Sequence, residues 1–192
     1  MKELEFYTIL PEYGKFLNKR DDRVRIMSSN KQNRPYIGVL FTVNRKDYIA
    51  PLGSPKPKHL NMKNNIDFIK IDQGNLGVIN LNNMIPVNQT LIRKIPVEQI
   101  QNQKYKDLLN KQRDWIKSHQ DTIKNKANTL YQKVVTNQIK PNIKARCCDY
   151  VKLEHHLDLY LQRIAERNQQ AKINQSRKRF TYHSKANENE GR

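Results

Sequence analysis

The spacing of apolar residues changes near residue 98, and this change limits the folds that the chain can adopt. Before that point, short runs rich in β-branched and aromatic residues predict strands over 5–9, 36–43, 48–50, 66–71, 76–81 and 85–87. After it, apolar residues recur at helical spacing and predict three helices, which begin near residues 98, 121 and 149, the last capped by Asp149. The face of the first helix includes Gln112, and the stripe of the second is Ile123, Ala127, Leu130, Tyr131 and Val134. A tight turn over 44–47 would join the strands 36–43 and 48–50 in a hairpin. Pro11 favours a further short helix over 11–18. The pattern therefore predicts an α+β fold, in which an antiparallel sheet is covered by helices mainly from the second half.

The length of the chain predicts a single domain with a tail. Its 192 residues suit one domain over 1–164, while residues 165–192 lose the apolar stripe and carry Arg177-Lys-Arg179. We expect this tail to be basic and partly disordered or helical. No apolar run is long enough to span a membrane, and residues 1–7 lack the apolar core of a signal peptide. The only two cysteines, Cys147 and Cys148, are adjacent, which excludes a disulfide framework and favours the reducing cytoplasm.

A formal net charge of +18 indicates a polyanionic partner. Nucleic acid is the first candidate and an anionic membrane the second, although a basic protein with no such partner is also possible. The charge is least balanced over residues 31–63, where seven cations face Asp47 alone. Protein surfaces usually mix both signs. We infer that phosphate groups neutralise this window.

The segment from Gly53 to His59, Gly-Ser-Pro-Lys-Pro-Lys-His, collects the groups that could act on a phosphate. Gly53 permits a close backbone approach, Ser54 offers a hydroxyl, and Lys56 and Lys58 offer compact positive charges. His59 can titrate near neutral pH. The three prolines and the glycine of residues 51–59 predict a stiff loop without regular structure. A proline-rich surface turn with solvated lysines explains the same residues equally well.

Metal-dependent chemistry fits this sequence poorly, because residues 31–66 offer a single carboxylate, Asp47, for the ions of a two-metal site. We predict no metal site and no cofactor. RNA carries its own nucleophile, the 2′-hydroxyl, so a protein needs only a proton acceptor, cations and an in-line geometry. The products would be a 2′,3′-cyclic phosphate and a 5′-hydroxyl, and DNA would not be cut.

Several motifs in the same order resemble the ToxN/AbiQ family, the toxins of type III toxin–antitoxin systems, and look most like AbiQ. They are Phe6-Tyr-Thr-Ile9 with Tyr13, Tyr36-Ile-Gly38, Tyr48-Ile-Ala-Pro-Leu-Gly-Ser-Pro-Lys56, Leu76-Gly-Val-Ile-Asn-Leu-Asn-Asn-Met-Ile-Pro86 and Tyr105-Lys-Asp-Leu-Leu109. The resemblance covers residues 5–163. It implies a metal-independent endoribonuclease with a compact antiparallel β-barrel-like sheet, related to the Kid/MazF toxins, and flanking helices.

The resemblance also implies RNA partners and a role in antiviral defence. A repeat antitoxin RNA would be processed by the toxin, inhibit it and form a closed protein–RNA assembly, while the free protein would be a monomer or weak oligomer. Released toxin would cleave cellular and phage RNA during abortive infection.

Site residues follow from the matching positions. Ser54, Lys56 and Arg34 would be catalytic, and RNA would be bound by Lys31, Gly53, Lys58 and His59. Relatives often carry threonine where this chain has Gly53, and lysine where it has Arg34, whose guanidinium is a poor base.

Two other functions compete with the ribonuclease. A non-catalytic RNA-binding module or regulator would use the same basic surface, with Ser54 incidental. A membrane-surface protein is disfavoured, because the sequence predicts no basic helix with a continuous apolar face of its own.

Overall fold

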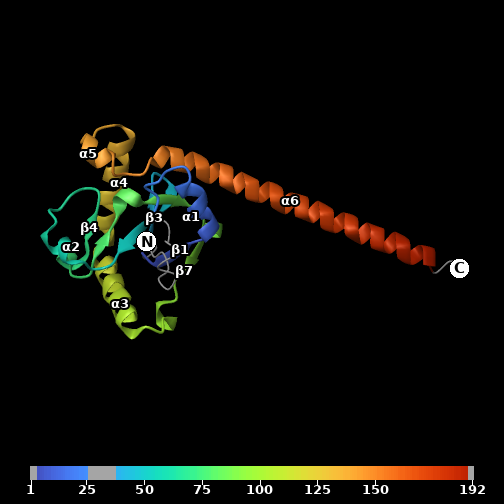
Figure 1. Ribbon diagram of the computed structural model, residues 1–192, viewed down its shortest axis with the longest axis horizontal. Helices are drawn as coiled ribbons and strands as arrows, with labels where there is room; N and C mark the ends of the chain where they lie inside the picture. Colours follow the sequence, from blue (N-terminus) through green and yellow to red (C-terminus); the bar gives the residue numbers. More distant parts are fainter. Residues whose placement is uncertain (1–3, 26–37, 190–192) are drawn as a thin grey trace. The chain divides into compact units, whose positions relative to one another are not determined.

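The computed structural model describes residues 4–25 and 38–189, with side chains up to residue 175. Strands occupy the first half of the chain and long helices the second, which confirms the predicted α+β fold (Figure 1). The strands are β1 (Phe6–Ile9), β2 (Gly38–Val43), β3 (Lys46–Gly53), β4 (Ile69–Lys70), β5 (Val78–Ile79), β6 (Ile85–Val87) and β7 (Ile92–Lys94). The helices are α1 (Pro11–Asn18), α2 (Pro57–Asn61), α3 (Gln103–Ser118), α4 (Gln120–Val135), α5 (Pro141–Lys144) and α6 (Tyr150–Asn189). Short 3-10 turns, η2 (Ile71–Gly74), η3 (Leu81–Asn83), η4 (Gln89–Leu91) and η5 (Val97–Gln99), join the later strands.

All strand pairs of the seven-stranded sheet are antiparallel, in the order β4-β5-β3-β2-β1-β7. The β2–β3 hairpin is its longest pairing and places Gly38 opposite Pro51. Asn44 and Arg45 both have positive φ, 47° and 63°, as a two-residue turn between twisted strands requires. This turn confirms the predicted hairpin.

On the edge opposite β2, strand β3 pairs with two different strands. Its first half pairs with β6, and its last residues, Leu52 and Gly53, pair with Ile79 and Val78 of β5. The end of β3 therefore lies beside the chain that connects β4 to β5. This placement decides which residues support the candidate site.

The long helices of the second half supply part of the core. In α4, which packs on β2, all five residues of the predicted stripe are buried: Ile123, Ala127, Leu130, Tyr131 and Val134. In α3, Leu109, Gln112 and Ile116 are buried. Asp149 caps α6 as predicted, because its Oδ1 accepts a hydrogen bond from the Lys152 backbone N–H at 3.1 Å.

A buried carboxylate ties the start of α6 to the hairpin. Glu154 accepts hydrogen bonds from the hydroxyls of Tyr48 at 2.6 Å and Tyr131 at 3.0 Å. Lys46 lies 3.4 Å from its other oxygen. Burial raises the pKa of Tyr48 far above its ordinary value, and the neighbouring Glu154 carboxylate adds to this effect. The phenol therefore stays a hydrogen-bond donor.

The prediction of irregular structure over residues 51–59 is wrong. Strand β3 continues through Pro51 to Gly53, and α2 begins at Pro57. A proline suits the first turn of a helix, because its fixed φ is helical and the missing N–H would have no intrahelical partner. Only residues 54–56 remain irregular.

Other elements also differ from the prediction. The strands predicted over 66–71 and 76–81 shorten to two residues each, because Asp72 and Gln73 adopt positive φ and turn the chain. Strand β7 and helix α5 were not predicted, since each is only three or four residues long.

The chain forms two compact units, Met1–His155 and His156–Arg192. In the second unit, α6 continues to Asn189, and residues 165–175 are all exposed. The domain limit at residue 164 and the character of the tail beyond it stay predictions. Among the described helices, none has a stretch apolar enough to cross a membrane.

Candidate ribonuclease site

Strand β3 ends in a short turn, residues 53–56, which we call the Ser54 turn. Pro55 has no backbone N–H and cannot continue the strand pairing, so the chain leaves the sheet here. Lys56 occupies the position before the first residue of α2, Pro57, and has extended backbone angles. Gly53 and Ser54 are half-buried, while Lys56 is exposed. The turn thus presents a hydroxyl and an ammonium group two residues apart.

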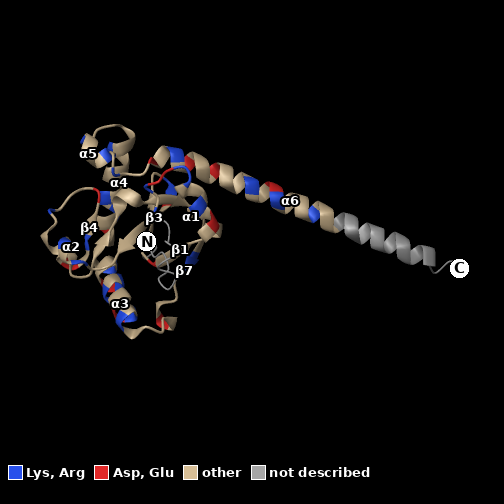
Figure 2. Ribbon diagram, viewed as in Figure 1, with Lys and Arg blue, Asp and Glu red and all other residues tan. Residues whose placement is uncertain are grey.

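The lysines of the Ser54 turn and α2 are not neutralised by protein carboxylates. Lys56 and Lys58 are both exposed, and neither has an ion-pair or hydrogen-bond partner among the described side chains. Lysine and arginine also stand out along α2 and α3 in Figure 2. Lys56 and Lys58 are therefore available to bind an external anion.

His59 lies in α2, but its side chain is only 5% exposed. Burial lowers the pKa of the imidazole, and the positive charges of Lys58 and Lys56 lower it further. The neutral form of the ring is therefore favoured, and its buried Nδ1 atom has no hydrogen-bond partner among the residues that the structure describes. The structure places His59 beneath the lysines rather than beside them at the surface.

The β4–β5 connection, residues 70–77, packs against the Ser54 turn and α2, and we call it the Gly77 loop. Gly77, with a φ of 95°, touches the backbone of residues 53–55 so closely that a Cβ there would collide with the carbonyl oxygen of Gly53. Gly74, with a φ of 105°, packs in the same way on the carbonyl of His59, 2.7 Å from the place of a Cβ. Both positions need the left-handed backbone that glycine adopts without strain.

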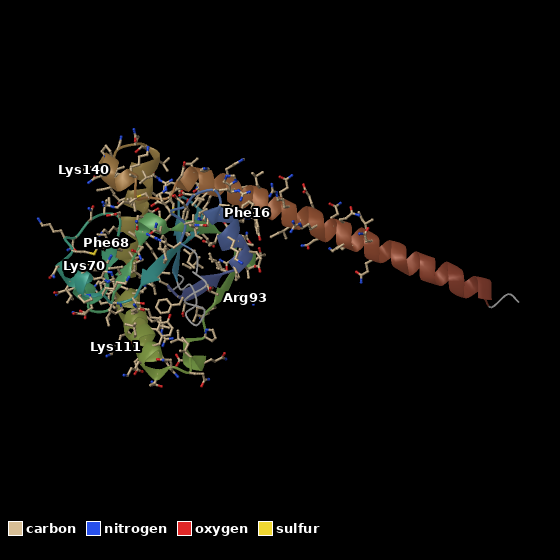
Figure 3. The ribbon with its side chains drawn as sticks, viewed as in Figure 1. Phe16, Phe68, Lys70, Arg93, Lys111 and Lys140 are labelled. Atoms are coloured by element: carbon tan, nitrogen blue, oxygen red, sulfur yellow. The ribbon has the colours of Figure 1, made fainter. Side chains whose placement is uncertain are left out.

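Side chains hold the Gly77 loop on both sides. Lys70, labelled in Figure 3, donates hydrogen bonds from its Nζ to the carbonyls of Leu60 at 2.9 Å and Met62 at 3.1 Å, and so closes the end of α2. From α3, the buried amide of Gln112 donates a hydrogen bond to the carbonyl of Leu76 at 2.6 Å. The loop is therefore fixed between α2 and α3.

Asn80, which follows β5, holds the end of β3. Its backbone N–H and its side-chain Nδ2 both bond to the carbonyl of Pro51, at 2.9 and 3.2 Å. From the sequence we predicted no role for Asn80 or Gln112. Two signals pointed to them: Asn80 falls inside the motif of residues 76–86, and Gln112 is the polar member of a predicted apolar face.

The structure thus brings five predicted site residues into one segment: Gly53, Ser54, Lys56, Lys58 and His59. The other two, Lys31 and Arg34, lie outside the described residues.

The carboxylates of the following segment have partners of their own. Asp67 is buried and bound by Arg146, whose Nε and Nη2 both lie 3.0 Å from its Oδ2. Asp72 accepts a hydrogen bond from Asn75 at 3.3 Å. Within the described part of the chain, no group of three or more His, Cys, Asp or Glu side chains could hold a metal ion. The chemistry that the described site offers is that of a hydroxyl and cations around a phosphate.

A family model and a curated relative both relate this chain to the same family of proteins. A model of the family "Toxin ToxN, type III toxin-antitoxin system" matches residues 5–158. The curated Endoribonuclease ToxN of Bacillus thuringiensis subsp. kurstaki is 33% identical over 185 residues, which cover 93% of this chain and 92% of that protein.

Two solved structures also match. One concerns a type III toxin inhibited selectively by a non-coding RNA pseudoknot; it is 32% identical, with a TM-score of 0.68 over 83% of this chain and 98% of its own. The other is AbiQ, a lactococcal anti-phage endoribonuclease, which shares the fold at 24% identity, with a TM-score of 0.70 over 84% of this chain and 99% of its own. Because the family model and the curated relative both match most of its length, the chain belongs to the ToxN family of toxins from type III toxin–antitoxin systems.

Proposed function

We propose that this protein is an endoribonuclease that cuts RNA without a metal ion, by attack of the ribose 2′-hydroxyl on the neighbouring phosphorus. The observation that carries the proposal is the Ser54 turn with the start of α2, a fixed segment that offers a hydroxyl and the ammonium groups of Lys56 and Lys58, which have no partner among the described side chains. These groups suit a reaction in which the substrate brings the nucleophile and the protein supplies charge and position.

In this reaction the 2′-oxygen loses its proton and forms a bond to phosphorus, and the bond to the 5′-oxygen breaks. The products are a 2′,3′-cyclic phosphate and a 5′-hydroxyl, which takes up a proton. Ser54 would orient the 2′-hydroxyl or a phosphate oxygen. Lys56 would carry a proton or clamp the phosphate, and Arg34 would stabilise the charge of the pentavalent intermediate.

Sheet pairing supports the inclusion of Arg34 in this set. Arg34 precedes the first residue of β2, Gly38, by four positions in the sequence, and Gly38 pairs with Pro51. Pro51 lies three residues before Ser54. The start of β2 is therefore next to the end of β3, where the Ser54 turn begins. Lys31, Gly53 and Lys58 complete the proposed RNA-binding set, whereas the buried His59 would support α2 from within and not contact RNA.

The relatives suggest how the activity is controlled. One relative is inhibited by a non-coding RNA pseudoknot, and another is an anti-phage endoribonuclease. We infer that a repeat antitoxin RNA is processed by this chain, binds it in a closed assembly and keeps it inactive in the cytoplasm. Released protein would then cleave cellular and phage RNA in abortive infection.

Incubation of the purified protein with RNA in excess EDTA tests the proposal. We expect cleavage with cyclic-phosphate ends, and no cleavage of the matching DNA, which lacks the 2′-hydroxyl. Ser54→Ala and Lys56→Ala should lose about 100-fold or more in rate while the circular dichroism spectrum is unchanged. Lys111→Ala, an exposed lysine of α3, serves as the matched control. RNA that stays intact in EDTA and is cut after magnesium is added would overturn the metal-independent mechanism.

A further inference from the structure

A second stretch of the chain carries positive charge without any carboxylate. Residues 122–148 contain six lysines and arginines and neither aspartate nor glutamate. They form most of α4, all of α5 and the segments around α5. Because solvated protein surfaces usually mix both signs, such a stretch suggests an external source of negative charge.

Three of these cations gather where α4 ends and α5 begins, and we call Lys133, Lys140 and Lys144 the α4–α5 corner. All three are exposed, and Lys140 is labelled in Figure 3. Lys144 donates a hydrogen bond to the neutral side chain of Asn137 at 2.8 Å. Among the described residues, none of the three has a carboxylate partner.

The other cations of the stretch have partners within the protein. Arg146 binds the buried carboxylate of Asp67, and Lys126 donates a hydrogen bond to the carbonyl of Phe68 at 2.9 Å. Lys124 donates one to the side chain of Gln120 at 3.3 Å. Among the described residues, the three corner lysines are exposed and contact no carboxylate, and the one side-chain partner among them is the neutral amide that Lys144 binds.

The backbone of the corner is fixed by hydrogen bonds and burial. Asn137, with a φ of 59°, ends α4, and the N–H of Gln138 bonds back to the carbonyl of Lys133 at 2.8 Å. Ile143 of α5 is buried, and the N–H of Cys148 bonds to the carbonyl of Asn82 at 2.8 Å. A fixed backbone lowers the entropic cost of presenting the lysines to a ligand.

A hollow beside the corner adds apolar surface. Lys144 lines it together with Val135, which is 42% exposed, and Val151, which is 52% exposed. Two charged groups in the same hollow are held by the protein. Arg23 is paired with Asp21 at 2.7 Å, and Asp149 caps α6. Exposed aliphatic side chains next to lysines suit a sugar or base attached to the bound phosphates.

We propose that the α4–α5 corner is a second RNA-binding surface, which holds the strand by its phosphates on elements other than the Ser54 turn. The identity of the ligand as RNA rests on the proposed function, because that function makes RNA the polyanion that the protein meets. Lysine ammonium groups bind phosphate as point charges and read no sequence, so the corner contributes affinity for long or structured RNA. Cleavage of an oligonucleotide that reaches only the Ser54 turn does not depend on it.

The test compares two full-length triple variants of equal net charge. One carries Lys133→Gln, Lys140→Gln and Lys144→Gln. The control carries Lys15→Gln, Lys104→Gln and Lys111→Gln, which change exposed lysines of α1 and α3. The ligand is a long RNA of mixed sequence with 2′-O-methyl riboses, which cannot be cut, and binding is followed by fluorescence anisotropy over a range of salt concentrations.

We expect the corner variant to bind this RNA about tenfold more weakly than the wild type, and the control to be close to it. The slope of log K against log salt should fall by about 2, as expected for three lost contacts to single-stranded phosphates. Equal losses in both variants, or none in the corner variant, would overturn the proposal. So would RNA binding that is unchanged while binding to anionic lipid vesicles is lost.

Cleavage of a short RNA substrate separates this inference from the proposed function. The corner variant should cut it at the wild-type rate. A wild-type protein that binds long RNA through the corner and cuts no RNA would refute the ribonuclease proposal and leave the corner as an RNA-binding surface.

Discussion

Gly77→Ala should disable the Ser54 turn, although Gly77 itself belongs to neither the proposed catalytic set nor the proposed RNA-binding set. The added Cβ would collide with the carbonyl oxygen of Gly53 and lie 3.1 Å from both the nitrogen of Pro55 and the carbonyl carbon of Ser54. All of these neighbours are backbone atoms, so no side chain can rotate away. The Gly77 loop and the Ser54 turn must therefore move apart.

Two effects set the size of the change. Alanine at a φ of 95° costs about 1–2 kcal/mol in backbone strain, and overpacking adds about 1–3 kcal/mol. We expect the free energy of unfolding to fall by about 3 kcal/mol. Non-bonded carbons settle about 3.5–4.0 Å apart, so the displacement of the turn is on the order of 1 Å. A misplacement of this size costs about 100-fold in rate at a positioned reaction centre.

The assay measures cleavage of a fluorescent RNA together with urea unfolding. Leu130→Ala is the matched control, because it truncates a fully buried side chain of α4 and should cost a similar amount, about 2–5 kcal/mol, away from the turn. At a temperature where both variants are folded, Gly77→Ala should be about 100-fold slower than the control. Equal cleavage rates in the two variants would refute the dependence of the Ser54 turn on the Gly77 loop.

Two further predictions concern the same region. Gln112→Leu leaves the half-buried carbonyl of Leu76 without its donor, so the free energy of unfolding should drop by about 1 kcal/mol. We also expect kcat to fall more than KM rises, and an unchanged kcat in a folded variant would argue against this link. Burial and the nearby lysines lower the pKa of His59 in the folded protein below its ordinary 6.5. Below that pH the unfolded chain binds a proton at His59 more readily than the folded protein does, so protonation favours unfolding. Unfolding free energy should therefore be insensitive to His59 above that pH and fall as the pH drops below it. Thermal melts of His59→Phe should lose this part of the pH dependence, and an identical pH dependence in both proteins would contradict it.

Predictions from the sequence succeeded where a single local pattern, such as a turn between strands or a helical apolar stripe, determined the structure. The residues between Val43 and Lys46 had few alternatives to a hairpin turn, because Asn44 and Arg45 separate an apolar strand from its partner. The α4 stripe was predicted completely, since its helical spacing is regular and it packs on a single face. Prediction failed at the prolines of 51–59, where two opposite effects of proline compete: it breaks strands and begins helices.

The candidate site was predicted only in its contiguous part. Residues 53–59 carry their chemistry in their types and spacing, so Ser54 and Lys56 could be named from the sequence. The structure adds the Gly77 loop, Asn80 and Gln112. These residues support the turn by contacts with backbone atoms of distant segments, and their residue types alone do not indicate such contacts. The relation to the Kid/MazF toxins and the roles of Lys31 and Arg34 stay predictions.

The site needs both halves of the chain, although its chemical groups all come from the first. The Ser54 turn depends on the Gly77 loop, and that loop is held by Gln112 of α3. Lys126 of α4 donates to the carbonyl of Phe68 just before β4, with its pKa lowered by burial. Removal of the helices would leave the turn's sequence intact but free its support to move. The ToxN family match, over residues 5–158, likewise spans both halves of the chain.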